Sequence, residues 1–247
     1  MTDSFLRFVD IEKAFGPKKV LRGVNLSVAR GETVVVLGGS GSGKSVLLRH
    51  AVGLVRPDAG QVFVEDLKIS ALDEDELQEP RKKVGMLFQS GALFDSMTVR
   101  ENVSFALTEH TDWDDAKVLA RTEEVLRLVE LEGALDLMPS DLSGGMRKRV
   151  ALARAIALAP AGILYDEPTT GLDPITANTI NHLIRSLQQR LGVTSVVVTH
   201  DIHSAFEVGD RIAFLHEGRI LFYGTTAEAR SATEPLLRNF LQGGGYA

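Results

Sequence analysis

One apolar run that passes into a glycine-rich loop constrains this chain more than any other feature. Val34 to Leu37 is typical of a buried strand, residues 38–45 read Gly-Gly-Ser-Gly-Ser-Gly-Lys-Ser, and Val46 to Val55 has a helical pattern. The segment matches G-x-x-x-x-G-K-[ST] in the strand–loop–helix context that this motif requires. A flexible Gly/Ser loop with a chance Lys-Ser pair is the alternative, and the flanking strand and helix disfavour it.

The loop is a candidate site for the phosphates of a nucleotide. Glycines allow positive φ and keep Cβ atoms away, so that backbone N–H groups can bind an anion. Lys44 would add a full positive charge at the β- and γ-phosphates, and the Ser45 hydroxyl is a hard oxygen ligand suited to Mg²⁺. The expected phosphate contacts come from Gly38, Gly39, Ser40, Gly41, Ser42, Gly43, Lys44 and Ser45.

Two acids follow a second apolar strand, Ile163 to Tyr165. Ligand-contacting residues of open α/β sheets gather at the carboxyl ends of strands. Asp166 would hold Mg²⁺ directly or through water, and Glu167 would polarise a water for attack on the γ-phosphate. Alone, the pair is equally well explained as solvated acids; beside the phosphate loop, it favours nucleotide turnover over nucleotide sensing.

The order of expected elements predicts an α/β protein. Residues 5–9, 20–28 and 33–37 are β-type runs, and strands alternate with helices again after residue 163. Between them, residues 116–131 and 141–159 have helical patterns. We expect an α/β core with a mostly parallel sheet, an antiparallel N-terminal sheet and a helical insertion near residues 90–158.

Composition excludes several classes of protein. The 247 residues are 44% hydrophobic, and their formal charge of −6 is unlike that of a generic nucleic-acid binder. The absence of cysteine excludes disulfides, thiolate catalysis and Cys-based zinc sites. Since no stretch of ~20 residues is apolar enough to cross a bilayer, and residues 1–5 show no secretory signal, we expect a cytoplasmic chain whose membrane role goes through a partner.

A further motif, Leu142-Ser143-Gly144-Gly145-Met146, opens the expected helix 141–159. Ser143 can cap that helix, and the basic residues Arg147, Lys148 and Arg149 follow. The alternative, without a function, is a glycine-rich helix start followed by a basic face exposed to solvent. Here the chain resembles the ATP-binding-cassette (ABC) ATPases, whose signature is Leu-Ser-Gly-Gly-Gln. The other family motifs appear in order: Phe15 before Gly16, Gln89 after the apolar run 84–88, Gly171-Leu172-Asp173, and His200 after 196–199.

The resemblance implies an ABC ATPase fold: a P-loop NTPase (RecA-like) core with an antiparallel β subdomain and a helical insertion. It implies a single domain over residues 1–247, with 1–90 and 159–247 forming the core and β subdomain and 91–158 the helical signature subdomain. It also implies that ATP, with Mg²⁺, binds between two copies of the chain. The resemblance implies that Phe15 stacks on the adenine and that His200 contacts the γ-phosphate. It implies that Gln89 senses Mg²⁺ and the γ-phosphate. The contacts that it implies from the partner copy are those of Ser143, Gly144, Gly145 and Asp173.

Local features resemble one branch of the family. Met146 stands where Gln is usual, and residues 88–94 read Phe-Gln-Ser-Gly-Ala-Leu-Phe. This is similar to the ATPase subunit of bacterial phospholipid transporters of the Mla/MCE type. The resemblance implies a transmembrane permease, an MCE-domain lipid-binding protein and a small STAS-type regulatory subunit as partners, at the cytoplasmic face of the inner membrane, with no nucleic acid.

Two alternatives stay open. One is the ATPase of another ABC importer or exporter, for amino acids, metals or lipoproteins. The other is a soluble ABC ATPase acting on nucleic acid or ribosomes, which the single cassette and the lack of a basic patch disfavour. We expect part of the segment containing Leu93, Phe94, Met97 and Val99 to line a groove for a permease helix; the alternative is that all four are core.

Overall fold

The computed structural model of the chain describes residues 4–243, so residues 1–3, on which the expectation about a secretory signal partly rests, and residues 244–247 lie outside it. Two sheets form the framework. The first is antiparallel, in the order β2-β1-β4-β5. Its strands are β1 (Ser4–Phe15), β2 (Lys18–Ala29), β4 (Ala59–Val64) and β5 (Leu67–Lys68).

The second sheet has the order β10-β9-β3-β8-β7-β6, and its strands are parallel from β9 to β6. Its members are β3 (Thr33–Leu37), β6 (Val84–Leu87), β7 (Gly162–Asp166), β8 (Thr194–Thr199), β9 (Arg211–His216) and the antiparallel β10 (Arg219–Thr225). Every residue of β3, β7 and β8 is buried. Their continuous apolar sequences follow from this, because strands covered on both faces have no solvent side to make polar.

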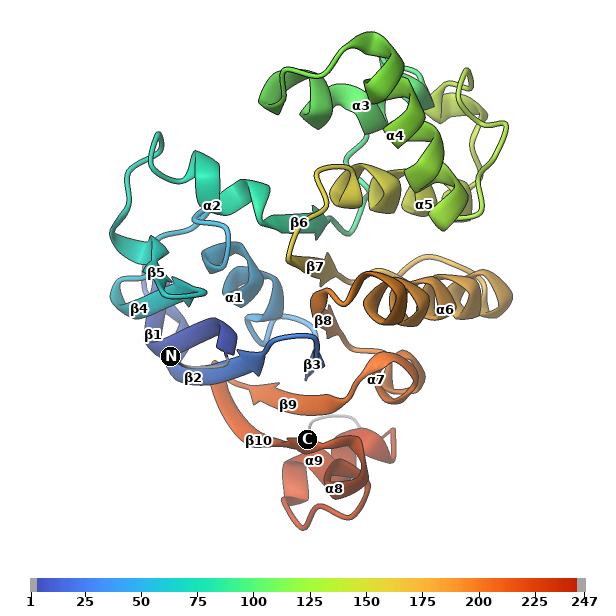
Figure 1. Ribbon diagram of the computed structural model, residues 1–247. Helices are drawn as coiled ribbons and strands as arrows, with labels where there is room; N and C mark the ends of the chain where they lie inside the picture. Colours follow the sequence, from blue (N-terminus) through green and yellow to red (C-terminus); the bar gives the residue numbers. More distant parts are fainter. Residues whose placement is uncertain (1–3, 244–247) are drawn as a thin grey trace.

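The helices fall into groups around the sheets. α1 (Lys44–His50) lies between the two sheets, whereas α6 (Pro174–Leu191) and α7 (Ile202–Val208) cover the opposite face of the parallel sheet (Figure 1). α3 (Val99–His110), α4 (Asp115–Leu128) and α5 (Gly144–Ile156) form a separate helical group beyond the β6 edge (Figure 1). The remaining helices are the short α2 (Gln78–Lys82), α8 (Thr226–Arg230) and α9 (Pro235–Leu241), with 3₁₀ turns at Ile69–Ala71 and Pro139–Asp141.

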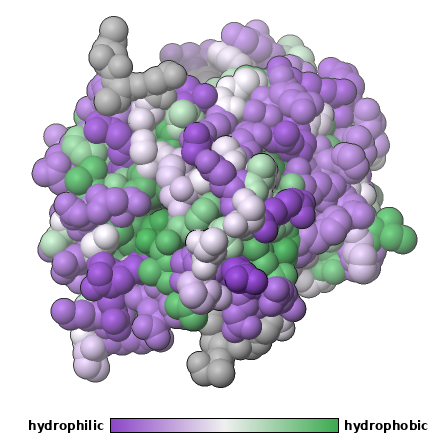
Figure 2. Space-filling model, turned by 90° about the horizontal axis from the view of Figure 1, so that it is seen from below, coloured by the Kyte–Doolittle hydropathy of each residue, from purple (hydrophilic) through white to green (hydrophobic). Residues whose placement is uncertain are grey.

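The core has two parts, separated by the parallel sheet. Because side chains alternate along a strand, Val34 and Val36 of β3 pack toward the antiparallel sheet and α1, while Val35 and Leu37 pack toward the helices on the other side. Figure 2 shows one end of the molecule, where hydrophobic residues gather toward the middle of a largely hydrophilic face. No helix within residues 4–243 combines the length and apolarity that crossing a membrane needs.

The predicted fold class is confirmed, with one antiparallel and one largely parallel sheet. The helix expected over residues 46–55 instead ends at His50, since the chain turns there and Gly53 has a φ of 68°. The helix expected from residue 141 begins at Gly144, after a 3₁₀ turn that starts at Pro139. Helices α3, α4 and α5 all fall between residues 91 and 158, where we predict the helical subdomain.

Candidate functional site

Three loops that carry the sequence motifs meet at one edge of the parallel sheet. In the sheet register, Leu37 of β3 pairs with Thr199 of β8, and Asp166 of β7 pairs with Val198. Each of these strands therefore ends at the same level. The phosphate loop, the Asp166–Glu167 pair and His200 come together because the carboxyl ends of parallel strands share an edge.

The phosphate loop curls around the side chain of Lys44. Gly43 closes the loop with a φ of 108°, a conformation that side chains rarely adopt, and α1 begins at the next residue. Lys44 is 5% exposed, and its Nζ donates to the carbonyl oxygens of Gly38 (2.9 Å) and Gly39 (3.0 Å). The ammonium group thus lies inside the loop, close to where an anion on the loop would bind.

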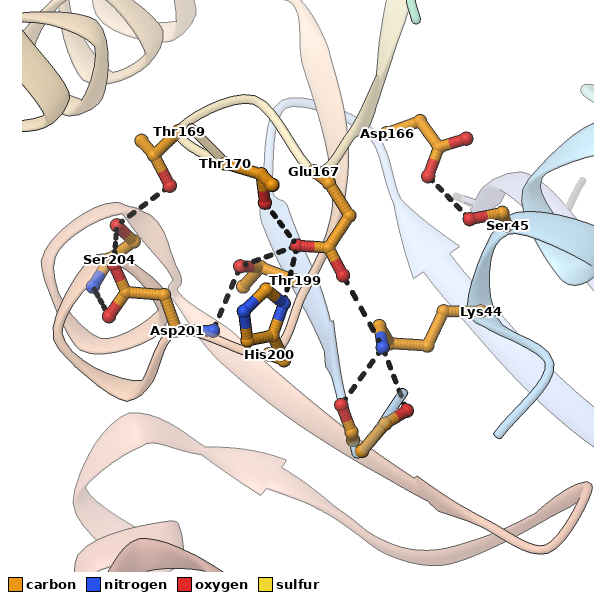
Figure 3. A network of polar contacts seen from close by, with 12 residues as sticks. Lys44, Ser45, Asp166, Glu167, Thr169, Thr170, Thr199, His200, Asp201 and Ser204 are labelled. Carbon is orange, nitrogen blue, oxygen red and sulfur yellow. Dashed lines mark hydrogen bonds and ion pairs between the residues drawn. The ribbon is translucent and has the colours of Figure 1, made fainter. Parts of the chain in front are cut away.

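Ser45 and Asp166 form a hard-oxygen pair beside that lysine. The Ser45 hydroxyl donates to Asp166 Oδ1 at 2.6 Å (Figure 3). Within residues 4–243, no cluster of three or more His, Cys, Asp or Glu side chains could hold a metal ion by itself. One hydroxyl and one carboxylate fit Mg²⁺, which usually takes one or two protein ligands and completes its shell with phosphate oxygens and water.

Glu167 is the centre of the polar network in Figure 3. Its Oε2 accepts hydrogen bonds from His200 Nδ1 (2.9 Å), Thr170 Oγ1 (3.1 Å) and Thr199 Oγ1 (3.4 Å). Its Oε1 lies 3.4 Å from Lys44 Nζ. The residue has a φ of 48°, in the left-handed region where a side chain is strained, as is common at functional sites. The carboxylate is therefore held from several sides and pointed at the phosphate loop.

A cavity of about 520 Å³ opens over these groups. Phe15, half exposed at the end of β1, lies on its wall together with Gln89, which is also exposed. The cavity combines an aromatic ring with a cluster of charged and polar groups, as a nucleotide requires. Its full lining is Phe15, Lys18, Val20, Ser40, Gly41, Gly43, Lys44, Ser45, Val46, Gln89, Glu167 and His200.

The signature residues Ser143, Gly144 and Gly145, and likewise Asp173, are not among those lining residues. Ser143 is exposed and caps α5, its Oγ accepting from the backbone N–H of Met146 at 3.2 Å. Asp173 caps α6 and accepts from the Thr176 hydroxyl, a bond that lowers the pKa of the Asp173 carboxyl. The structure thus gathers the phosphate-loop, carboxylate, Gln89, His200 and Phe15 positions into one site and leaves the signature outside it.

Sequence reasoning missed the burial of Lys148. The non-functional alternative for residues 147–149 was a basic face exposed to solvent, but Lys148 is only 5% exposed. Burial lowers the pKa of its ammonium, whereas the charges of Asp166 and Glu167 raise it. The available signal was helical spacing: Gly145, Lys148 and Leu152 lie three and four residues apart, and all three are buried on one face of α5.

Comparison with known proteins identifies the family of the chain. The family profile described as "ABC transporter" matches residues 21–170, more than half of the chain. The chain therefore belongs to the ABC transporter family, and its class is that of an ATP-binding, ATP-hydrolysing transporter cassette.

Among individual relatives, the chain is 40% identical to the Escherichia coli intermembrane phospholipid transport system ATP-binding protein MlaF, over 95% of this chain and 87% of that protein. It is 39% identical to TRIGALACTOSYLDIACYLGLYCEROL 3, a chloroplastic protein of Arabidopsis thaliana, over 98% of this chain and 74% of that one. It is also 38% identical to the probable ribonucleotide transport ATP-binding protein mkl of Mycobacterium bovis, over 98% of this chain and 69% of that protein.

Solved structures show the same fold. The ATP-binding cassette MJ0796, solved as a dimer in a post-hydrolysis state bound to ADP and Pi, is 36% identical with a TM-score of 0.83, covering 90% of this chain and 98% of that one. The cbiO1 protein of Clostridium perfringens, part of the ABC transporter complex cbiONQ, is 28% identical with a TM-score of 0.86, covering 98% of this chain and 96% of that one.

Proposed function

We propose that two copies of this chain bind ATP and Mg²⁺ between them and hydrolyse ATP to drive phospholipid transport between membranes. The observation that carries the enzymatic part is the placement of Glu167, whose carboxylate faces the phosphate loop and is held by His200, Thr170 and Thr199. Ser143, Gly144 and Gly145 of the signature do not line the same chain's cavity, which supports a site completed by a second copy. A homologous cassette is dimeric and bound to ADP and Pi.

Each group has a role that its position supports. The loop and Lys44 bind the β- and γ-phosphates, and Phe15 stacks on the adenine. Ser45 and Asp166, with Gln89, would hold Mg²⁺, which would screen the phosphate charge. Glu167 accepts the proton of the attacking water, and His200 orients Glu167 and contacts the γ-phosphate. Ser143, Gly144, Gly145 and Asp173 of the partner copy close the site.

The proposal of a lipid substrate is supported by the names of the relatives. MlaF is named for phospholipid transport and the Arabidopsis relative for a galactolipid, whereas mkl is named as a probable ribonucleotide transporter. These two names favour a lipid substrate, and the name of MlaF specifies phospholipid. The assembly that this implies has a permease, an MCE-domain lipid-binding protein and a STAS-type subunit, with the chain held by the permease at the cytoplasmic face of the inner membrane.

A second cavity of about 500 Å³ supports a permease contact. It lies next to the Gln89 loop and includes Phe88, Phe94 and Phe105, with the rings of Phe94 and Phe105 5.1 Å apart. Val99, expected as a candidate groove residue, is fully buried in the helical core, because it begins α3 and packs inward. Leu93 also packs against that core, and Met97 is not among the residues that line the cavity, so Phe94 is the residue of the predicted segment that we place in the groove.

The test of the enzymatic part is Glu167→Gln. We expect ATP affinity to stay near that of the parent and the hydrolysis rate to fall by roughly 10²–10⁴-fold, because the amide keeps the shape but cannot take the proton. Lys44→Ala should act on binding instead, weakening ATP affinity by about 10-fold or more through loss of a charge-assisted contact. Glu79→Gln, at an exposed ion pair on α2, is the matched control. Steady-state turnover of Glu167→Gln near that of the parent would show that another group activates the water.

A further inference from the structure

We propose that Lys148 is a positioning residue for ATP hydrolysis, holding the backbones of Gln89 and Glu167 in register with helix α5. This inference rests on the proposed function. It concerns a residue that does not line the nucleotide cavity and that no motif of the sequence analysis assigned to the site.

The first observation is the pair of contacts that Lys148 makes. Its Nζ donates a short hydrogen bond to the carbonyl oxygen of Gln89, and lies 3.3 Å from the carbonyl oxygen of Glu167. These carbonyls belong to two different loops, one after β6 and one after β7. One side chain from α5 therefore joins the backbones of both residues.

The second observation is that the bridge is buried. Lys148 is 5% exposed, and Glu167 is 7% exposed. A buried ammonium is strongly unfavourable unless hydrogen bonds and opposite charge compensate it. The two carbonyl oxygens supply the bonds, and the carboxylates of Asp166 and Glu167 supply the charge. The buried ammonium therefore links its two partners inside the protein.

The third observation is the second attachment of the same helix. Arg154, six residues further along α5, donates to the carbonyls of Gly91 (2.9 Å) and Ala92 (2.8 Å). Arg154 thus holds only the Gln89 loop, whereas Lys148 also reaches the end of β7. Since α5 starts at Gly144 of the signature, a displacement of that helix is passed through Lys148 to both site loops.

The test compares Lys148→Met, Lys148→Arg and Arg149→Met in the full chain, in the assembly with which it co-purifies. Methionine has a side chain of similar length without hydrogen-bond donors, whereas arginine keeps donors within reach of the two carbonyls. Arg149 is the control position, because its guanidinium donates to the carbonyl oxygen of Glu130 within the helical group. We expect Lys148→Met to lower kcat about 10-fold with KM for ATP within about 2-fold. Lys148→Arg should recover at least about half of the parent kcat, and Arg149→Met should stay close to the parent.

Amide hydrogen exchange gives a readout that does not depend on turnover. With Lys148→Met, exchange should become faster in both residues 86–94 and residues 164–172, while α6 and β3 keep the parent's rates and show that the fold is intact. Parent-like kcat, or faster exchange in only one of the two segments, would overturn the bridge. A parent that binds but never hydrolyses ATP would refute the proposed function instead, and exchange would still show whether Lys148 bridges the two loops.

Discussion

Lys44 and Glu167 face each other across the site. Their charged atoms are 3.4 Å apart, and both side chains are at most about a tenth exposed. At such burial the attraction is screened less than at the surface. In the proposed function, the phosphates of ATP interact with Lys44, and the carboxylate of Glu167 acts on water. At the scale of single residues, the proposed phosphate-binding group and the proposed catalytic group thus hold each other in place.

The burial of His50 predicts that the stability of the fold depends on pH. It ends α1 at 1% exposure, with its Nδ1 2.6 Å from the Val46 carbonyl oxygen and its buried Nε2 without a hydrogen-bond partner among the described residues. Burial lowers its pKa below the ordinary 6.5. The folded state therefore favours neutral histidine, whereas the unfolded chain takes up a proton as the pH falls through 6.5.

We expect the free energy of unfolding to fall as pH drops below about 6.5, with a slope of up to about 1.4 kcal/mol per pH unit from this residue. Urea denaturation between pH 8 and 5 measures it. His50→Leu should flatten that part of the curve, and His182→Leu, at an exposed position on α6, should not. Equal slopes for the parent and His50→Leu would assign the pH dependence to other groups.

At the scale of elements, the junction of β6 with α5 places the Gln89 loop. Gly85 of β6 lies so close to α5 that an added Cβ would stand 2.3 Å from the carbonyl oxygen of Ala155. Backbone atoms cannot yield as a flexible side chain can, so the strand and the helix must separate to admit a methyl group. The loop that follows β6 would then lose its position relative to α5.

Gly85→Ala should therefore reduce the free energy of unfolding by about 1–3 kcal/mol, as overpacking does in well-packed cores. Chemical denaturation measures the change. The matched control is Gly144→Ala, where an added Cβ has its nearest contact at 3.4 Å from Leu172 Cδ2. Equal stability of the two variants would mean that the β6–α5 junction adapts freely.

How much the sequence predicts also depends on the element. The strands β3, β7 and β8 and the site at their ends follow from continuous apolar runs with motifs directly behind them. Helix α3 was missed because only part of it is apolar; its start depends on a capping box between Thr98 and Glu101. The bridge by Lys148 was missed because its partners are distant in the sequence: Gln89 lies 59 residues before it and Glu167 lies 19 residues after it. Such contacts follow from packing and not from a local sequence pattern.

At the scale of the whole molecule, the groove beside the Gln89 loop is the predicted attachment to a membrane subunit. Phe94 and Phe105 are 42% and 38% exposed there. Phe94→Asp should abolish co-purification with the permease, because it removes an exposed aromatic ring from the proposed contact and puts a charge in its place. Thermal stability and ATP affinity should stay near the parent's. Trp113→Asp, at a 36% exposed aromatic residue outside this groove, is the control; full association of Phe94→Asp would place the contact elsewhere.

The arrangement of the whole molecule leaves Ser143, Gly144 and Gly145 outside the cavity that holds Lys44 and Glu167. The central claim is therefore that two copies of the chain complete each ATP site. Light scattering of Glu167→Gln with and without ATP tests it most directly, because this variant should bind ATP and not consume it. With ATP we expect twice the 26.8 kDa mass of the chain, and with Ser143→Arg added we expect the doubling to disappear. An unchanged mass with saturating ATP, or a doubling that survives Ser143→Arg, would contradict the claim.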